Sequence, residues 1–138
     1  MGSYEVGAVV GTGAYAVVKS AYCPRTQRTL ALKVYLKSSL QEKTRRASVD
    51  TEIRVLGKLD HPNIIKLHEV IDSPAELVLV LELVPGDSLY ALLKQRRTHR
   101  LSELEARPIF GAVVSALVHC HAQQISHRDV KLNDIGVV

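Results

Sequence analysis

The sequence predicts an α+β fold in which a group of strands comes before the longest helix. Two apolar segments flank a turn that contains Gly11 and Gly13, and a run of alternating leucines and valines, 77–81, lies near the middle of the chain. Helical spacing of apolar residues is clearest after Ser102. Strands and helices that occur in separate blocks are typical of an α+β domain.

The composition is that of one globular domain. The chain has 138 residues, of which 46% are apolar, and a net charge of +4. These values suit a domain with its own core and argue against disorder. Aromatic residues make up 4%, which leaves few rings to stack on bases, so we expect no nucleic acid partner. No apolar run reaches about 18 residues, so we expect no membrane span.

Cysteine usage and the amino terminus favour the cytoplasm or the nucleus. Cys23 and Cys120 lie far apart, without the spacing of a zinc site or a disulfide framework. Residues 1–6 lack the basic flank and apolar core of a signal peptide, and Val6 replaces the Ser or Thr of a myristoylation signal. We therefore expect a reducing compartment, cytoplasmic or nuclear.

Residues 4–20 predict a strand, a glycine turn and a second strand. Gly11 and Gly13 let backbone N–H groups approach phosphates without a Cβ in the way. A strand after the glycines separates this pattern from a dinucleotide-binding motif, in which a helix follows. The alternative is an ordinary glycine hairpin.

Residues 29–36 predict a strand with a single charge, Lys33, in its middle. A buried ammonium needs a partner or a cleft, and the alternative is that the end of the side chain reaches water. Apolar residues at helical spacing predict a helix over 38–59. The sequence alone does not distinguish Glu52 on this helix from any other surface charge.

The next segment predicts a pair of strands and a short helix. Pro62 blocks continuation of the helix before it. Strands are expected over 66–72 and 76–83, and the second is nearly all apolar, as a covered central strand should be. Asp87 or Ser88 is then expected to cap a short helix.

The most clearly marked helix begins at Ser102. Ser102 and Glu105 form the pattern of a capping box. Pro108 is interpreted as a bend within the helix rather than as its boundary. A buried apolar stripe is expected at Ala106, Ile109, Phe110, Val113, Val114, Leu117 and Val118.

The segment 125–134 resembles the catalytic loop of the eukaryotic serine/threonine protein kinases, because His127-Arg128-Asp129 is followed two residues later by Lys131. Phosphoryl transfer needs a carboxylate to orient the attacking hydroxyl and a cation near the transferred group, and the resemblance implies that Asp129 and Lys131 supply these two chemistries. Taken alone, the segment is better interpreted as a polar loop after a helix.

Five motifs, in this order, resemble those of the eukaryotic serine/threonine protein kinases. They are Gly11-Thr12-Gly13-Ala14-Tyr15-Ala16, Leu30-Ala31-Leu32-Lys33, His61-Pro62-Asn63-Ile64, Glu82-Leu83-Val84-Pro85-Gly86 and His127-Arg128-Asp129-Val130-Lys131. The segment from Ala106 to His121 is similar to the corresponding segment of the calcium/calmodulin- and AMP-activated-kinase-like group. The resemblance implies a kinase N-lobe over 1–84, made of a five-stranded antiparallel sheet and one helix, and part of a C-lobe over 85–138.

The resemblance also implies cofactors, a substrate class and residue roles. The cofactors are ATP and Mg²⁺, and the substrate is a protein serine or threonine if the C-lobe is completed. Asp129 and Lys131 would be catalytic, and Asp134 would bind the metal. The residues implied for ATP binding, with Glu52 as the partner of Lys33 and Leu81 guarding the inner pocket, are Gly11, Thr12, Gly13, Ala14, Tyr15, Ala16, Val18, Ala31, Lys33, Glu52, Leu81, Glu82 and Val84.

The chain departs from the family pattern in several places. Ala16 replaces the third glycine, Asp134 replaces an asparagine, and Gly136 stands where the family places an apolar residue beneath adenine. The chain also holds no Asp-Phe-Gly, activation-loop or Ala-Pro-Glu segment. We therefore expect a truncated domain that is inactive alone and whose final strand, 135–138, lacks its hairpin partner. The alternatives are a pseudokinase-like module that binds nucleotide or a partner without turnover, and an unstable fragment.

The truncation carries one expectation about association. Later helices of the C-lobe would cover the apolar rows of the 102–123 helix. Without them, we expect a bound partner or self-association through this helix.

Overall fold

The computed structural model of the chain describes residues 4–137, which form two compact units. The first contains the described residues up to Lys58 together with Ile65–Leu83. The second contains Leu59–Ile64 together with the described residues from Val84 onward. The lobe boundaries expected from the sequence, 1–84 and 85–138, remain a prediction, and the compact units differ from them in assigning 59–64 and Val84 to the second unit.

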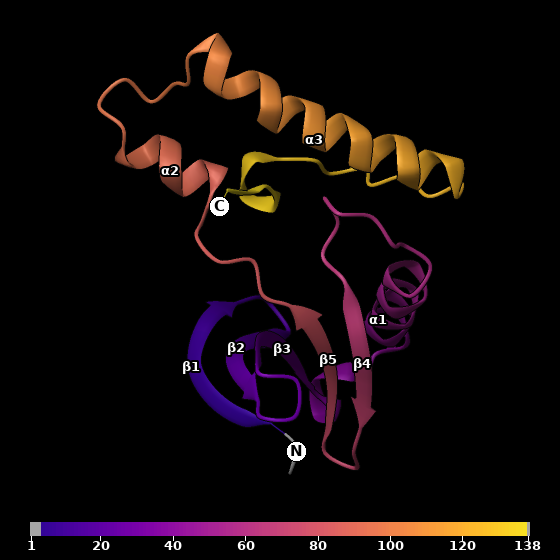
Figure 1. Cartoon of the computed structure of the whole chain (residues 1–138). Helices are drawn as coiled ribbons and strands as arrows, with labels where there is room; N and C mark the ends of the chain where they lie inside the picture. Colours follow the sequence, from indigo (N-terminus) through magenta and orange to yellow (C-terminus); the bar gives the residue numbers. More distant parts are fainter. Residues whose placement is uncertain (1–3, 138) are drawn as a thin grey trace. The chain divides into compact units, whose positions relative to one another are not determined.

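A five-stranded antiparallel sheet makes up most of the first unit (Figure 1). β1 is an edge strand, and its pairing with β2 is irregular between Val6 and Val9 and again between Val9 and Gly11. Such irregularities bend a strand and increase its twist, and β1 is strongly curved in Figure 1. In spatial order the strands are β1 (Glu5–Thr12), β2 (Ala16–Cys23), β3 (Arg28–Leu36), β5 (Glu76–Glu82) and β4 (Leu67–Asp72).

The core of this unit lies on both faces of β3 and β5. Successive residues of a strand point to opposite faces, so the apolar run 77–80 supplies both faces, and its members are at most 1% exposed. One face holds a cluster of Ala21, Cys23, Leu30, Leu32, Val34, Val78 and Val80. The other holds Ala16, Tyr35, Leu40, Val49, Leu77 and Leu79. Because both faces of β5 are covered, its sequence shows no alternation of polar and apolar residues.

The helix predicted over 38–59 is wrong in its first part. The structure has a 3₁₀ turn, η1 (Lys37–Leu40), and then a shorter helix, α1 (Lys43–Leu56). Glu42 between them has an extended backbone, with φ −71° and ψ 125°. Leu40 is 6% exposed and packs in the core on one face of the sheet, which holds the 3₁₀ turn against the sheet as an element separate from α1. Val49 of α1 packs in the same cluster and places the helix on that face.

The second unit contains two helices and a small two-stranded sheet. Ser88 rather than Asp87 caps α2, because its Oγ accepts the N–H of Ala91 at 3.2 Å. The capping box at Ser102 and Glu105 is confirmed, and α3 runs without interruption through Pro108. The elements are β6 (Asp87–Ser88), α2 (Leu89–Gln95), α3 (Glu103–Ala122), η2 (Leu132–Asp134) and β7 (Gly136–Val137).

The segment 59–64 belongs to the second unit because it contacts α3. His61 Nε2 lies 3.0 Å from Ser115 Oγ, and its ring centroid lies 5.2 Å from that of His119. His61 Nδ1 accepts the backbone N–H of Asn63 at 3.1 Å. That bond assigns the proton of a neutral His61 to Nε2, which can then donate to Ser115.

One expectation for this unit is corrected by the structure. The apolar residues of α3 do not form one buried stripe, since Phe110, Val114 and Val118 are 69%, 40% and 62% exposed. The last strand, β7, pairs with the distant strand β6, with Val137 opposite Asp87, which is not a hairpin pairing. Val138, also predicted to be in this strand, lies outside the described residues.

None of the helices among residues 4–137 combines the length and the apolarity needed to span a membrane.

Candidate functional site

Lys33 and Glu52 form an ion pair at the centre of the first unit. β3 carries Lys33 between Val18 of β2 and Leu79 of β5, and α1 carries Glu52. Lys33 Nζ lies 2.6 Å from Glu52 Oε1, and the two side chains are 28% and 30% exposed. The structure therefore answers both questions that the sequence left open: Lys33 has a partner, and Glu52 is not merely one more surface charge.

The environment of Lys33 favours its charged form. Burial lowers the pKa of the Lys33 amine, but the hydrogen bonds and charges of Glu52 and Tyr35 outweigh it, so the pKa is raised. A raised pKa keeps the ammonium fully charged at neutral pH. A fixed cation on a half-buried strand is well suited to hold phosphate oxygens.

Tyr35 is a member of this cluster that sequence reasoning missed. Its hydroxyl donates to Glu52 Oε2 at 2.8 Å, and the residue is 5% exposed. Lys33 Nζ lies 5.4 Å from the centre of the Tyr35 ring. The available signal was the spacing on a predicted strand, since residues 33 and 35 must share one face.

The glycine turn is exposed and is joined to α1 by an aromatic contact. Gly13 N–H donates to the carbonyl oxygen of Ala16 at 2.8 Å, which closes the turn. The guanidinium carbon of Arg45 on α1 lies 4.3 Å from the centre of the Tyr15 ring, within the range of a cation–π interaction. Thr12, Gly13, Ala14 and Tyr15 are exposed, whereas Ala16 is buried at the start of β2.

The residues predicted at the end of β5 are placed in different units. Ala31 of β3 lies opposite Leu81 of β5. The N–H of Glu82 donates to the carbonyl oxygen of Lys66 at 2.9 Å, and Glu82 Oε2 accepts the N–H of Lys66 at 3.3 Å. Val84 belongs to the second unit, where its side chain packs against Gly136.

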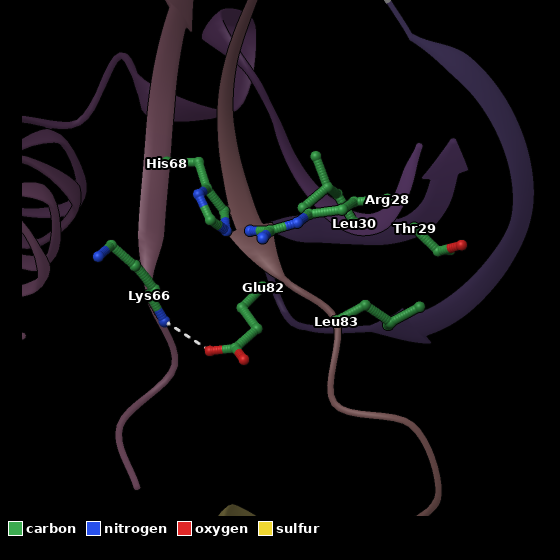
Figure 2. Close-up of a pocket in the computed structure, with 7 residues that line it drawn as sticks. All are labelled: Arg28, Thr29, Leu30, Lys66, His68, Glu82 and Leu83. Atoms are coloured by element: carbon green, nitrogen blue, oxygen red, sulfur yellow. Dashed lines mark hydrogen bonds between the residues drawn. The ribbon is translucent and has the colours of Figure 1, made fainter. Parts of the chain in front are cut away.

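A pocket of about 430 Å³ lies at this end of the sheet (Figure 2). Of the residues predicted for ATP binding it contains only Glu82, and it contains neither Lys33 nor the glycine turn. It is therefore not the cavity that the predicted ATP-binding residues outline. Its lining is Arg28, Thr29, Leu30, Lys66, His68, Glu82 and Leu83.

In the second unit, Asp129 and Lys131 form a second ion pair. Lys131 Nζ lies 2.5 Å from Asp129 Oδ2, and the side chains are 53% and 74% exposed respectively. The hydrogen bond and charge of Lys131 lower the pKa of Asp129, and those of Asp129 raise the pKa of Lys131. Both groups therefore remain charged at neutral pH. Asp129 N–H donates to His127 Nδ1 at 3.3 Å, which fixes the start of the loop.

The backbone of this loop is strained at Arg128, whose φ is 69°. A non-glycine residue with positive φ is uncommon, and such strain is concentrated at functional sites. Asp134 closes the other end of the loop: its Oδ2 accepts the N–H of Lys131 at 3.3 Å, and its own N–H donates to the carbonyl oxygen of Lys131 at 3.0 Å. Asp129 and Lys131 thus lie between two local hydrogen-bonded contacts.

Asp134 fits a magnesium site as a single protein ligand. Within residues 4–137, three or more His, Cys, Asp or Glu side chains nowhere converge as a metal cluster. Magnesium usually binds one or two protein carboxylates and completes its shell with water and phosphate oxygens. One oxygen of Asp134 already accepts a backbone N–H, which leaves Oδ1 for a cation.

The chain matches known proteins along nearly its whole length. Residues 4–137 match the model of the protein kinase domain. The chain is 37% identical to CBL-interacting serine/threonine-protein kinase 24 of Arabidopsis thaliana over 131 residues, which are 95% of the chain and 29% of that protein. It is 37% identical to the carbon catabolite-derepressing protein kinase of Saccharomyces cerevisiae, covering 95% of the chain and 20% of the relative.

A third relative gives similar values. The chain is 39% identical to serine/threonine-protein kinase DCLK3 of Mus musculus over 134 residues, which are 97% of the chain and 16% of that protein. The chain therefore spans less than a third of the length of the curated relatives it matches.

Proposed function

The chain belongs to the protein kinase family, and from this premise we propose that it binds ATP with Mg²⁺ as part of a serine/threonine protein kinase. The reaction is phosphoryl transfer from ATP to a serine or threonine hydroxyl of a protein. In such a reaction the protein contributes mainly positioning and charge stabilisation.

The first unit supplies the residues for the nucleotide. Lys33, held by Glu52, would bind phosphate oxygens of ATP, and the glycine turn would lie over them. The hydrogen bond from Gly13 N–H to Ala16 keeps that turn narrow and occupies that N–H group. Glu82 and Val84 would bind adenine through their backbone, with Leu81 limiting the depth of the pocket.

The second unit supplies the residues for the acceptor hydroxyl. Because the pKa of Asp129 is lowered, its carboxylate is ionised at neutral pH and can accept a hydrogen bond from that hydroxyl. Lys131 holds one carboxylate oxygen, which orients the other, and it brings a positive charge to the transferred group. Mg²⁺, held in part by Asp134, would neutralise phosphate charge.

The single observation that carries the proposal is the ion pair between Lys33 and Glu52. These residues are 19 positions apart in sequence, and the fold brings their charged atoms to 2.6 Å. We expect Lys33→Met to lower the affinity for Mg·ATP by about tenfold or more, measured by titration calorimetry, since charge-assisted contacts to phosphate are strong.

Lys37→Met provides the matched control for that experiment. Lys37 lies in η1 and pairs with Asp72, away from the strand centre. This variant should bind Mg·ATP like the original chain. Equal affinities of both variants and the original chain would contradict the proposal.

A second candidate function is nucleotide binding without turnover. The feature that favours it is Asp134 in place of the asparagine of the family pattern, because an aspartate lacks the amide donor and adds a negative charge beside the phosphates. The 138-residue chain should then bind ATP without Mg²⁺ nearly as well as with it, and should transfer no radiolabelled phosphate to a basic peptide. Transfer that is lost in Asp129→Asn would instead favour the kinase reaction by this chain.

We also propose that copies of this chain associate through the exposed side of α3. Phe110, Val114 and Val118 are spaced by four residues and form one row along the helix, here called the Phe110 row. Exposed apolar rows of this kind promote association. A second copy presents the same row and so supplies a matching apolar surface.

A further inference from the structure

Tyr35 is placed to act on the same carboxylate as Lys33. Both side chains leave β3 on one face, and Tyr35 lies opposite Ala16 of β2 and Leu77 of β5. The ring is packed in the cluster that contains Leu40, Val49 and Leu79. The Tyr35 hydroxyl donates to Glu52, and the Lys33 ammonium lies 5.4 Å from the centre of the Tyr35 ring.

The two oxygens of Glu52 are held by different donors on one strand. Oε1 accepts from Lys33 Nζ at 2.6 Å, and Oε2 accepts from Tyr35 Oη at 2.8 Å. A carboxylate bound only by a lysine retains freedom of rotation, because an ammonium has no fixed directional preference. A second hydrogen bond, from a buried and rigid tyrosine, removes that freedom.

We propose that Tyr35 is a positioning residue whose hydroxyl fixes the carboxylate of Glu52, so that Lys33 is oriented before nucleotide binds. This inference rests on the proposed function, because it assigns to Tyr35 the support of the predicted phosphate-binding lysine. It also makes a claim about the chain without nucleotide, namely that the contact between α1 and β3 at Glu52 depends on the tyrosine hydroxyl.

Tyr35→Phe separates the hydroxyl from the ring. The phenylalanine ring fills the same place in the core, so stability should change little, while Glu52 loses its second donor. Tyr22→Phe is the matched control, because Tyr22 lies on β2 and is 40% exposed. Tyr35→Leu is a second variant that also removes the hydroxyl and should act in the same direction.

The first measurement is the pH profile of Lys33 acetylation by acetic anhydride, without nucleotide, followed by mass spectrometry. Glu52 and Tyr35 each raise the pKa of Lys33, so loss of the tyrosine hydroxyl removes its own contribution and, when the carboxylate turns away, weakens that of Glu52, and both changes yield more neutral amine. Tyr35→Phe should therefore increase the acetylation rate of Lys33 by about threefold or more at mildly alkaline pH. Lys19 is the internal reference, and its rate should not change.

Glu52→Gln shows that the assay detects the ion pair. If Glu52→Gln shifts the Lys33 profile to lower pH while Tyr35→Phe leaves it unchanged or moves it to higher pH, the inference is wrong. If Tyr35→Phe fails to fold, the same comparison is made with Tyr35→Leu, and an unchanged profile there overturns the inference equally.

The second measurement is the affinity for Mg·ATP. Tyr35→Phe should weaken binding by about threefold, less than Lys33→Met, because the tyrosine acts through Glu52. The acetylation measurement distinguishes a failure of the Tyr35 inference from a failure of the proposed ATP-binding function. A shifted Lys33 profile without any effect of Lys33→Met on ATP affinity supports the role of Tyr35 and contradicts the proposed function.

Discussion

At the scale of single residues, the contact between Val84 and Gly136 leaves no room for a side chain. A Cβ built on Gly136 would lie 2.8 Å from Val84 Cγ1, closer than such atoms approach. Valine is stiff at its Cβ, so it cannot turn away at low cost. The structure thus gives a local reason for glycine at a position where the resemblance implies a larger apolar residue.

Gly136→Ala should destabilise the second unit by about 1–2 kcal/mol through this overlap. The exchange of the Leu89 N–H, which donates to the carbonyl oxygen of Ile135, reports on it directly by NMR. Gly111→Ala is the control, because no atom lies within 4 Å of its added Cβ and it lies inside α3. That variant should stabilise the chain by about 0.5–1 kcal/mol. Faster exchange of the Leu89 N–H in Gly111→Ala but not in Gly136→Ala would refute the overlap with Val84 as the cause.

Residue-level prediction worked where a charge interrupted an apolar pattern. Lys33 was identified because a single ammonium inside a strand needs an explanation, and Glu52 followed from the resemblance. Tyr35 was missed because an aromatic residue in a strand is ordinary, and only the tertiary contact shows that its hydroxyl meets Glu52. The contact between Asp129 and Lys131 was likewise not predicted, because it depends on the local conformation of the loop, which residue types alone do not determine.

At the scale of elements, the beginning of α3 is held by a network of side chains around Glu105. Its carboxylate accepts from the N–H and the hydroxyl of Ser102 and pairs with Arg96 Nη2 at 2.7 Å. The hydrogen bond of Arg96 comes first among the causes that lower the pKa of Glu105 to about 2, and the Ser102 bonds add to it.

This network should make the start of α3 sensitive to strong acid. A carboxylate with a lowered pKa stabilises the fold above its ordinary pKa of 4.5, and the contribution is lost as pH falls toward about 2. The side-chain carboxyl carbon of Glu105, followed by NMR, should therefore titrate with a midpoint near 2. Arg96→Gln should move that midpoint toward 4.5. An unshifted midpoint in the original chain would show that the network does not persist in solution.

Elements were predicted well where local chemistry marks them. The capping box fixed the start of α3, and turn residues separated the strands of the sheet. The helix after β3 was predicted too long, because the spacing of Val49, Ile53 and Leu56 does not show that Leu40 is drawn into the sheet core. The pairing of β6 with β7 was missed because each strand has only two residues and no periodic pattern.

At the scale of the whole molecule, the two units differ in how much apolar surface they bury. Most of the buried residues within 4–137 belong to the sheet, whereas Leu59, Leu89 and Cys120 are those of the second unit. Regions with few buried contacts open locally at lower free energy than the core. We therefore expect the backbone amides of Leu79 and Val80 to exchange slowest, and those of α3 to exchange faster by about tenfold or more. Equal protection in α3 and β5, measured by hydrogen exchange, would contradict this.

The Phe110 row is an apolar surface that stays exposed in the described part of the chain. Both faces of β3 and β5 are covered by apolar residues, whereas Phe110 on α3 is 69% exposed. Burying such a side chain against a second copy gains about 1.5–3 kcal/mol. The average mass measured by light scattering should therefore rise with concentration, and Phe110→Glu should reduce that rise, because a charge in an apolar contact is costly. Gly111→Glu adds the same charge beside the row and should have a smaller effect. A constant monomer mass for the original chain over the whole concentration range would exclude association through α3.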